Sequence, residues 1–457
     1  MQQTTIAAIA TAPVKSGLGV IRISGPEALR VAGRVFQCKN RDRKLADMPG
    51  HTVCYGVLSD RSGQLDDGVA TVFRAPRSYT GEDVVEFSCH GGVYSLKKIL
   101  AACFDAGAEP AMAGEFTKRA FLNGKLDLTE AEAVADLIEA EGERALKAAL
   151  CQKDGALHKR VDRLADRLKM LCSHLAAVLD FPEEDVEQID RQALLTGTES
   201  CLQDLTALIA TYHQSAPIRD GVTIAIVGKP NVGKSSLLNS LAGQDCAIVT
   251  DIAGTTRDVV SARMELSGLA VTLLDTAGIR ETEDVIEAEG VRRSKAACDR
   301  ADLILAVFDR SAPLDGEDEL MLSELAGKEN VLCILSKKDR PALCDKNRLK
   351  QAFHQVTEVS SVTGQGTGQL LEQLRERLRM EEFHPEDGMI ANERQLASAR
   401  QAADCCRRAL EALEMGMTFD AVSVELEQAL GALYTLSGKR ASDSIIEDVF
   451  SRFCVGK

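Results

Sequence analysis

Apolar residues recur at alternating steps of four and three residues in two separate stretches of the chain. The first stretch contains Leu157, Val161, Leu164, Leu168, Leu171, Leu175 and Val178, and the second contains Leu396, Ala399, Ala403, Cys406, Leu410 and Leu413. This spacing forms one apolar face on a helix, which packs against another helix. We call these two apolar faces seams. We expect both seams to pack inside one helical bundle, with a free-standing coiled coil as the alternative. Thr129 and Glu132 have capping-box spacing, and Gly416 is the expected stop of the second helix.

Between the two seams the pattern changes to short apolar runs separated by helical patterns. The runs cover 223–227, 270–274, 303–308, 331–335 and 355–359. Strands that alternate with helices predict a parallel sheet covered by helices on both faces. Because this α/β unit separates the two helical stretches, we expect it to be inserted into one helical domain.

The beginning of the chain has a mixed pattern that predicts an α+β domain. Strands are expected at 19–25, 69–73 and 83–87, and a helix at 94–104 follows a pair of glycines. The length of 457 residues suggests about three domains. The expected segments are 1–122 (α+β), 123–215 (helical, first part), 216–378 (α/β) and 379–457 (helical, second part).

Composition and charge narrow the class of protein. Hydrophobic residues make up 45% and charged residues 27%, which excludes wholesale disorder. The net charge of −15 argues against binding nucleic acid by broad charge neutralisation, although a local basic face could still bind RNA. No apolar run approaches the roughly 20 residues of a membrane-spanning helix, and the N-terminus does not resemble a signal peptide. We expect a cytoplasmic protein whose fourteen cysteines are buried apolar residues or free thiols.

The strongest chemical signal is a complete GxxxxGK[ST] motif at Gly228–Ser235, between a predicted strand and a predicted helix. Its backbone N–H groups and the helix N-terminus form a cradle for phosphate. Lys234 is suited to reach the β- and γ-phosphates, and the Ser235 hydroxyl to bind Mg²⁺. The expected GTP contacts in this segment are Asn231, Val232, Gly233, Lys234, Ser235 and Ser236.

Two further segments are suited to surround the phosphates. Asp275 begins a DxxG motif at the end of a predicted strand, where it would hold Mg²⁺ through water while the Gly278 N–H senses the γ-phosphate. The polar segment 254–258 (GTTRD) is suited to a switch, and Thr256 is the expected second protein ligand of Mg²⁺. The expected contacts are Thr250, Asp251, Ile252, Ala253, Gly254, Thr255, Thr256, Asp275, Thr276, Ala277 and Gly278.

The segment 336–339 (SKKD) is suited to bind the base. The Asp339 carboxylate can accept both the N1–H and the 2-amino N–H of guanine, and adenine offers no such pair. Together these four segments resemble the GTPase signature set, in which Asn stands at the first position of this segment. Since Ser336 cannot make both hydrogen bonds of an amide, we expect GTP specificity through Asp339 with weaker affinity. The expected contacts are Ser336, Lys337, Asp339, Ser360, Ser361 and Val362, of which Ser361 is a second departure from the family pattern.

The residue after Gly278 is Ile279, where Ras-like GTPases have a Gln that orients the attacking water. Hydrolysis therefore needs other assistance. Asn231 together with the GTTRD segment resembles potassium-activated GTPases, in which K⁺ supplies the positive charge. By position the resemblance implies K⁺ ligands at Asn231, Thr250, Ile252 and Thr255. Glu287 is either a catalytic residue that orients water through an intermediary or an ordinary solvated acid.

Motifs outside the nucleotide-binding segments indicate which kind of GTPase this is. They are GVIRISG at 19–25, GEDVVE at 81–86, GEFTKRAFLNGKLDL at 114–128, FPEED at 181–185 and FCVGK at 453–457. In this order, and without large gaps, they resemble the MnmE (TrmE) family of tRNA modification GTPases.

The resemblance implies an N-terminal folate-binding domain that also forms a homodimer, a helical domain and an inserted G domain. It further implies an FAD-dependent partner, MnmG (GidA), in a heterotetramer with the GTPase. Together they place a (carboxymethyl)aminomethyl group on C5 of the wobble uridine of certain tRNAs, with a one-carbon unit from 5,10-methylene- or 5-formyl-tetrahydrofolate. The implied folate contacts are Arg22, Glu86, Lys125 and Lys457. For Cys454, a catalytic thiolate and a buried apolar residue both remain open.

Two alternatives belong to other classes. Ribosome-assembly GTPases of the Era or Der type share Asn231 and the GTTRD segment, but they bind ribosomal RNA through a KH-like domain, and the helical C-terminal part here lacks its GxxG loop. A nucleotide-dependent scaffold would use hydrolysis only to reset binding. The folate-type motifs of the N-terminal part argue against both alternatives.

Overall fold

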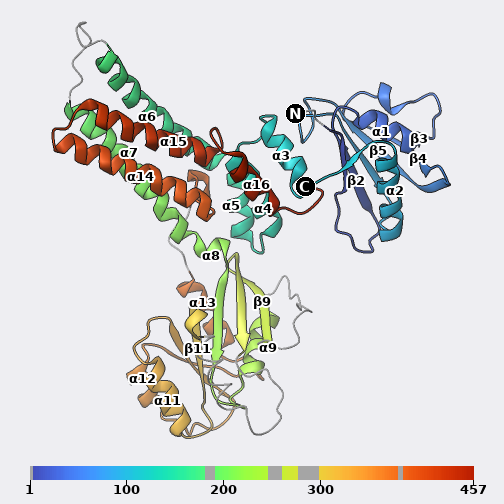
Figure 1. Cartoon of the computed structure of the whole chain (residues 1–457). Helices are drawn as coiled ribbons and strands as arrows, with labels where there is room; N and C mark the ends of the chain where they lie inside the picture. Colours follow the sequence, from blue (N-terminus) through green and yellow to red (C-terminus); the bar gives the residue numbers. More distant parts are fainter. Residues whose placement is uncertain (1–3, 181–190, 245–259, 276–297, 379–383) are drawn as a thin grey trace. The chain divides into compact units, whose positions relative to one another are not determined.

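The computed structural model forms two compact units, and each is described by itself (Figure 1). It describes residues 4–180, 191–244, 260–275, 298–378 and 384–457. The first unit contains Met1–Ala135, Gln152–Ile209 and Asn392–Lys457, and the second contains Asp136–Cys151 and Ala210–Ala391. These units divide the chain differently from the four predicted segments, whose boundaries stay a prediction.

The N-terminal part of the first unit is a seven-stranded sheet with the order β3-β4-β5-β6-β2-β1-β7 among the described residues. The strands are β1 (Ile6–Ile9), β2 (Gly19–Ser24), β3 (Phe36–Cys38), β4 (Thr52–Asp60), β5 (Gly63–Phe73), β6 (Val84–Cys89) and β7 (Glu109–Pro110). Helices α1 (Ala28–Val35) and α2 (Val93–Asp105) bury apolar residues against one face, including Ile21 and Phe87. Since side chains alternate along a strand, Arg22 and Glu86 lie on the opposite face.

The predicted strands at 19–25, 69–73 and 83–87 and the predicted helix at 94–104 are confirmed. Strands β1, β3, β4 and β7 were missed. β4 alternates buried and exposed positions, but its exposed positions include apolar Val53 and Tyr55, which hides the period of two.

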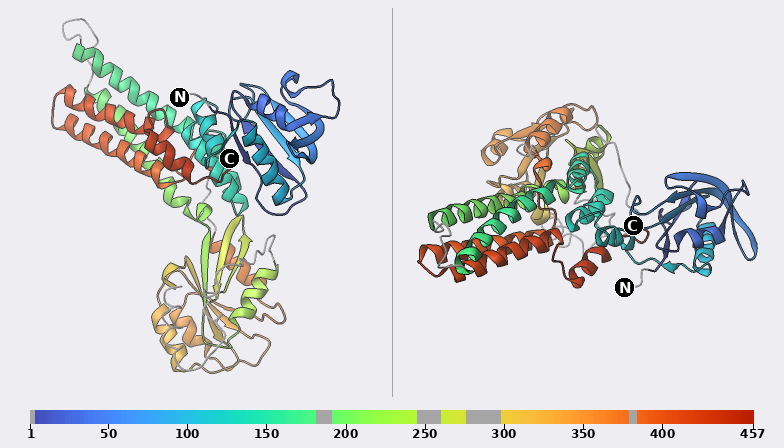
Figure 2. Two further views of the ribbon diagram at one scale, coloured as in Figure 1. Left: turned by 45° about the vertical axis from the view of Figure 1, so that its right-hand side comes forward. Right: turned by 90° about the horizontal axis from the view of Figure 1, so that it is seen from above.

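A helical bundle completes the first unit (Figure 2). It contains α6 (Ala156–Asp180), α7 (Arg191–Gln214), α14 (Glu393–Glu414) and α15 (Phe419–Ser437). α15 packs against both α6 and α14, so helices from before and after the α/β unit share one bundle. The seam residues Leu157, Val161, Leu168 and Leu175 are buried, and the predicted insertion is confirmed. Gly416, at φ +72°, follows the end of α14 as expected.

The capping box was predicted two residues too late. Asp127 accepts a hydrogen bond from the N–H of Glu130 (2.7 Å), and Glu130 accepts one from the N–H of Asp127 (2.8 Å). Thr129 donates to the Asp127 carboxylate, and Glu132 is buried in an ion pair with Arg394. The remaining helices of the first unit are α3 (Glu115–Leu122), α4 (Leu128–Glu139) and α16 (Asp443–Ser451). Helix α5 (Glu143–Lys153) lies largely in the second unit, where the Arg144 N–H donates to the Gly268 carbonyl (2.9 Å).

The second unit contains a six-stranded sheet with the order β13-β12-β11-β8-β10-β9 among the described residues. Its strands are β8 (Val222–Val227), β9 (Val260–Leu266), β10 (Leu269–Asp275), β11 (Leu303–Asp309), β12 (Val331–Ser336) and β13 (Val356–Glu358). Its helices include α8 (Ala216–Arg219), α9 (Lys234–Gln244), α11 (Gly316–Leu325), α12 (Lys346–Ala352) and α13 (Thr367–Arg377). Alternate residues of β8 belong to two separate apolar clusters, one with Leu237 of α9 and the other with Leu322 of α11. Helices therefore cover both faces of the sheet, as predicted.

One edge of this sheet differs from the prediction of a parallel sheet, because β9 runs antiparallel to β10. Only Ser267 and Gly268 separate the two strands, and both have positive φ (57° and 80°). A connection this short joins only antiparallel strands, and positive φ at both positions is typical of a tight hairpin turn.

None of the helices in the described residues has the length and apolar character that crossing a membrane requires. The cysteines of the described residues are all free, and eight of them are buried, as expected for small apolar residues.

Candidate functional site

The phosphate loop lies between the end of β8 and the start of α9, at the carboxyl ends of the parallel strands. Its tight path requires positive φ at Gly228 (156°), Asn231 (62°) and Gly233 (101°). A Cβ on Gly228 would lie 2.4 Å from the Val307 carbonyl of β11, so only glycine fits there. The Lys234 ammonium lies inside the loop and donates to the carbonyl oxygens of Gly228 (2.6 Å) and Lys229 (2.7 Å).

The first turn of α9 presents two exposed hydroxyl residues, Ser235 and Ser236, next to the loop. Asn231 is also exposed, whereas Val232 is buried in the core of the second unit. This arrangement suits a phosphate group on the helix N-terminus with a hard cation beside it.

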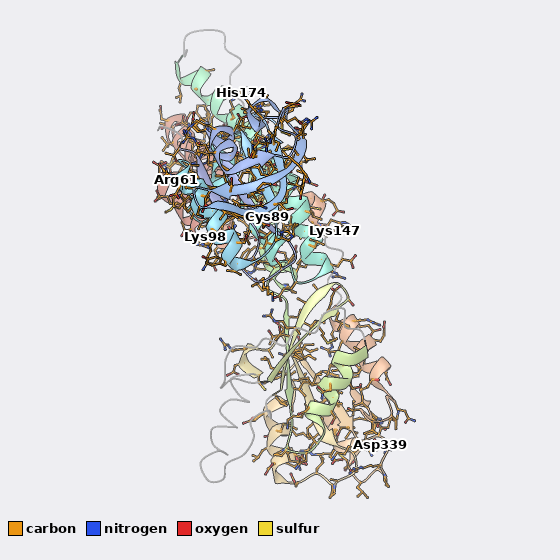
Figure 3. The ribbon with its side chains drawn as sticks, turned by 90° about the vertical axis from the view of Figure 1, so that its right-hand side faces the viewer. Arg61, Cys89, Lys98, Lys147, His174 and Asp339 are labelled. Atoms are coloured by element: carbon orange, nitrogen blue, oxygen red, sulfur yellow. The ribbon has the colours of Figure 1, made fainter. Side chains whose placement is uncertain are left out.

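The predicted base-binding segment is joined to the phosphate loop by Ser336, the last residue of β12. Its buried hydroxyl lies 2.5 Å from the Val232 carbonyl and 3.0 Å from the Phe308 carbonyl. Asp339 accepts a hydrogen bond from the Ser360 hydroxyl (2.5 Å), which lowers the pKa of Asp339 and keeps this carboxylate ionised. Figure 3 shows Asp339 in the second unit.

Lys337 has φ +56° and pairs with Asp309 (2.6 Å) at the end of β11. Ser361 is half-buried and Val362 is exposed in the loop after β13. The structure therefore brings together the phosphate loop, the SKKD segment and Ser360, as the sequence predicts.

The other expected phosphate and cation contacts fall outside the described residues. They are Thr250, Asp251, Ile252, Ala253, Gly254, Thr255, Thr256, Thr276, Ala277, Gly278 and Glu287. The backbone of Asp275 ends β10 in register with Ile226 of β8, so the DxxG motif starts beside the phosphate loop.

A second site forms on the exposed face of the N-terminal sheet. Arg22 and Glu86 face each other on β2 and β6, and their side chains form an ion pair (2.7 Å). The Arg22 guanidinium lies 5.5 Å from the ring centre of Tyr79 and 5.4 Å from that of Phe116. It also lies 3.5 Å from the main-chain oxygen of Gly456.

The C-terminal residues contribute to this second site through their main chain. Val455 forms a β-bridge with Ala113, and the Phe116 N–H donates to the Lys457 carbonyl (3.1 Å). Gly456 has φ +100°, and a Cβ there would lie 2.3 Å from the Ile9 carbonyl. The motifs at 19–25, 81–86, 114–128 and 453–457 therefore meet.

Lys125 lies in a neighbouring pocket of about 420 Å³. The pocket is lined by His51, Phe73, Arg77, Ser78, Tyr79 and Lys125. The Lys125 ammonium donates to the Pro76 carbonyl (3.1 Å). Tyr79 borders both the pocket and Arg22, donates or accepts a hydrogen bond with Thr117 (2.8 Å), and has a pKa raised by burial. Sequence analysis missed Tyr79, Arg77 and Phe116, since only the fold brings them to this face.

Cys454 is exposed, so the alternative of a buried apolar residue is wrong. Its main-chain oxygen accepts a hydrogen bond from Gly114 (3.4 Å). A catalytic role for its thiol stays a prediction.

Several motif residues near this face are structural. Arg119 pairs with Glu82 (3.2 Å) and Glu115 (2.8 Å), and Ser24 donates to Glu82 (2.7 Å). Glu82 and Ser24 are buried. This network joins β2 and α3 to the segment that carries Tyr79.

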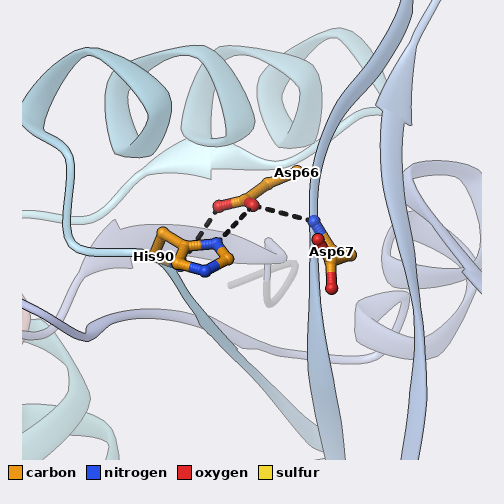
Figure 4. Close-up of side chains that lie close together, drawn as sticks. All are labelled: Asp66, Asp67 and His90. Carbon is orange, nitrogen blue, oxygen red and sulfur yellow. Dashed lines mark hydrogen bonds and ion pairs between the residues drawn. The ribbon is translucent and has the colours of Figure 1, made fainter.

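A further cluster, which sequence analysis did not single out, contains Asp66, Asp67 and His90 (Figure 4). Asp66 accepts hydrogen bonds from the His90 ring (2.7 Å), the His90 N–H (3.1 Å) and the Asp67 N–H (2.8 Å). These bonds attach β5 to the turn before α2. The hydrogen bond to Asp66 raises the pKa of His90.

The phosphate loop and the parallel strands that carry it define the class of the protein, a P-loop GTPase. Two family models match the chain: "MnmE helical domain" over residues 128–454 and "GTP-binding protein TrmE N-terminus" over residues 5–125. The chain belongs to the MnmE family of tRNA modification GTPases.

Curated relatives match along the full length. A tRNA modification GTPase MnmE from Symbiobacterium thermophilum is 40% identical over 460 residues, covering 100% of both chains. The MnmE proteins of Listeria innocua and Thermoanaerobacter pseudethanolicus are 38% and 39% identical, with coverage of 100% and 99% of both chains. The predicted GTPase activity and family are confirmed, and these matches disfavour the ribosome-assembly alternative.

Proposed function

We propose that this GTPase is activated by potassium and works with an FAD-dependent MnmG partner on certain tRNAs. The pair installs a (carboxymethyl)aminomethyl group at C5 of the wobble uridine, using a one-carbon unit of tetrahydrofolate. The proposal is supported by the meeting of Arg22, Glu86 and the C-terminal residues on one face of a chain that also carries a GTP site.

Folate chemistry fits the groups on this face. Arg77 and Lys125 place two cations at the pocket, which suits the carboxylates of a folate tail. The rings of Phe73 and Tyr79 in the same pocket offer apolar surface to an aromatic ring. Glu86 can accept hydrogen bonds from pterin N–H groups, while Arg22 and Lys457 complete the proposed set. Cys454 is proposed to supply a catalytic thiolate at the same face.

Magnesium and potassium fit the groups around the phosphate loop. The exposed Ser235 hydroxyl and Thr256 are the proposed Mg²⁺ ligands. The exposed Asn231 side chain, with the carbonyls of Thr250, Ile252 and Thr255, is the proposed K⁺ ligand set. K⁺ supplies positive charge at the phosphates, and Glu287 orients water in place of the missing Gln. Equal GTPase rates in KCl and NaCl at matched ionic strength would contradict this part.

We further propose a cytoplasmic homodimer formed through the N-terminal parts, in a heterotetramer with MnmG. The sheet face opposite α1 and α2 leaves Val53 (58%) and Tyr55 (48%) exposed, which supports an apolar contact. GTP and K⁺ would bring two G domains together, and hydrolysis would separate them.

The decisive experiment measures tRNA nucleosides by mass spectrometry in cells that lack the gene. Rescue is compared for wild type, Lys234→Ala, Arg22→Ala and a control, Arg61→Ala, whose side chain is exposed outside both sites. We expect the C5-modified wobble uridine to return only with wild type and the control. An unchanged uridine profile in the deletion strain would overturn the proposed function.

A further inference from the structure

The second residue of the phosphate-loop motif, Lys229, has a side chain that does not point into the phosphate cradle. Its ammonium lies 2.5 Å from Asp315 and 2.7 Å from Asp318. Asp315 is the N-cap of α11 and accepts from the N–H groups of Glu317 and Asp318, while Asp318 accepts from the N–H of Asp315. Lys229 therefore binds both side chains of a capping box.

The main chain of Lys229 contacts the phosphate-binding lysine. Its carbonyl oxygen accepts a hydrogen bond from Lys234 (2.7 Å), the residue that binds the β- and γ-phosphates. The preceding Gly228 packs against the Val307 carbonyl of β11. One residue thus connects the N-terminus of α11 with the carbonyls that hold the phosphate-binding lysine.

The buried carboxylate of Asp318 depends on the positive charge of Lys229. The Asp318 side chain is only 6% exposed, and its second oxygen, Oδ1, makes no hydrogen bond among the described residues. A buried carboxylate that loses its cation is strongly destabilising. Although burial opposes it, the hydrogen bonds to Asp315 and Asp318 raise the pKa of Lys229, so the ammonium stays charged at neutral pH.

We propose that Lys229 is a positioning residue for GTP: its bridge to Asp315 and Asp318 holds the first half of the phosphate loop in its nucleotide-binding form. Lys234 exchanges the carbonyls of Gly228 and Lys229 for phosphate oxygens when GTP binds. The bridge keeps those carbonyls and the N–H groups of the loop in place during that exchange. The bridge acts on the loop before and after the chemical step, so its loss weakens nucleotide binding more than it slows turnover.

The test uses the full-length chain, with nucleotide affinity measured by titration with a fluorescent GDP and with GTPase kinetics and thermal unfolding in parallel. For Lys229→Met we expect Kd and KM to rise about tenfold, which is the size of one hydrogen-bond contribution, with kcat within twofold. Lys229→Arg keeps a cation at the capping box, so we expect it to restore affinity. Lys328→Met, an exposed lysine of the same unit, is the charge-matched control and leaves Kd unchanged.

A second variant separates positioning from stability. Lys229→Met leaves Asp318 buried without its cation and lowers the melting temperature. Adding Asp318→Asn removes the buried charge, so the double variant recovers melting temperature while its Kd stays raised. Wild-type Kd in Lys229→Met, joint recovery of melting temperature and Kd in the double variant, or a rise in Kd in Lys328→Met would each overturn the proposal.

Discussion

Ser336 stands at the position where the usual GTPase signature has an Asn amide. Its hydroxyl has only one hydrogen to donate, whereas an amide has two. Its oxygen lies between the carbonyls of Val232 and Phe308, so it can donate to only one of them at a time. The contact attaches the base-binding segment to the phosphate loop. It leaves no donor for the base itself, so we expect Asp339 to make the main contacts with the base.

Removal of this hydroxyl is therefore expected to weaken binding of all guanine nucleotides. Ser336→Ala leaves the buried Val232 carbonyl without this donor. We expect the free energy of binding to weaken by about 1 kcal/mol, so that Kd for GDP rises about fivefold. Ser336→Asn restores a second N–H and is expected to lower Kd below that of wild type. Titration of both variants with GDP measures this, and an Asn variant that binds more weakly than the Ala variant would contradict it.

Asp339 is expected to set base specificity. Asp339→Asn replaces an acceptor by a donor, so guanine loses one charged hydrogen bond and faces a mismatched group. We expect GTP affinity to fall more than tenfold, since a hydrogen bond to a charged group contributes about 1.5–3 kcal/mol. Affinity for XTP, which has an oxygen at C2 of the base, is expected to rise. Competition between GTP and XTP measures the switch.

The His90–Asp66 pair predicts a pH dependence of stability. Because the pKa of His90 is raised on folding, its contribution is fully present below the unfolded pKa and disappears as pH rises through the folded value. We expect the difference in melting temperature between wild type and His90→Gln to be larger at pH 6 than at pH 8.5. A difference that grows toward high pH would contradict this assignment.

At the scale of elements, sequence patterns predicted α2, the seam helices α6 and α14, the helix after the phosphate loop and the buried strands of the second unit. The two seam helices repeat an apolar period, and the buried strands are short apolar runs. The patterns failed where other interactions decide the structure. β9 was missed because its pairing depends on the turn at Ser267 and Gly268. The capping box was misplaced because Thr129 and Asp127 are both capable caps, and only the geometry of α4 decides between them. The phosphate loop was predictable because its ligands are contiguous, whereas Tyr79 joins Arg22 across 57 positions of sequence.

The junction of α4 with α14 is expected to be a stability determinant. Glu132 is 7% exposed and accepts hydrogen bonds from Arg394 (2.6 and 2.8 Å) and Gln395 (2.7 Å). Glu132→Ala leaves the largely buried Arg394 guanidinium without its carboxylate partner. We expect the free energy of unfolding to fall by about 3 kcal/mol. The control is Asp404→Ala, which removes an exposed partner of Arg407. We expect it to change the free energy of unfolding by less than about 0.5 kcal/mol. Thermal unfolding of both variants measures the difference.

At the scale of the whole molecule, one chain carries two sites in two compact units, and the inserted unit contains the complete described part of the nucleotide site. The fold class followed from the order of patterns along the chain. The proposed folate site did not follow from patterns alone, because its residues come from both ends of the sequence and were suggested only by resemblance.

Removal of residues 453–457 is expected to affect the two sites differently. It deletes the carbonyls that Gly114 and Phe116 bind and the oxygen beside Arg22. We expect loss of tetrahydrofolate binding, measured by calorimetry, with GDP affinity within twofold of wild type. Equal folate affinity in the truncated and full-length chains would contradict the proposed site.

The contact between Arg22 and Gly456 spans 434 positions of sequence. A ribosome that has just made β2 must add all of those residues before the site can close, which takes roughly 20–90 s at ordinary synthesis rates. The N-terminal sheet can fold early in that interval, but it presents only part of the proposed folate site. If that proposal holds, incomplete chains, including those from interrupted translation, would neither withdraw cofactor from the cell nor start chemistry before the rest of the enzyme exists.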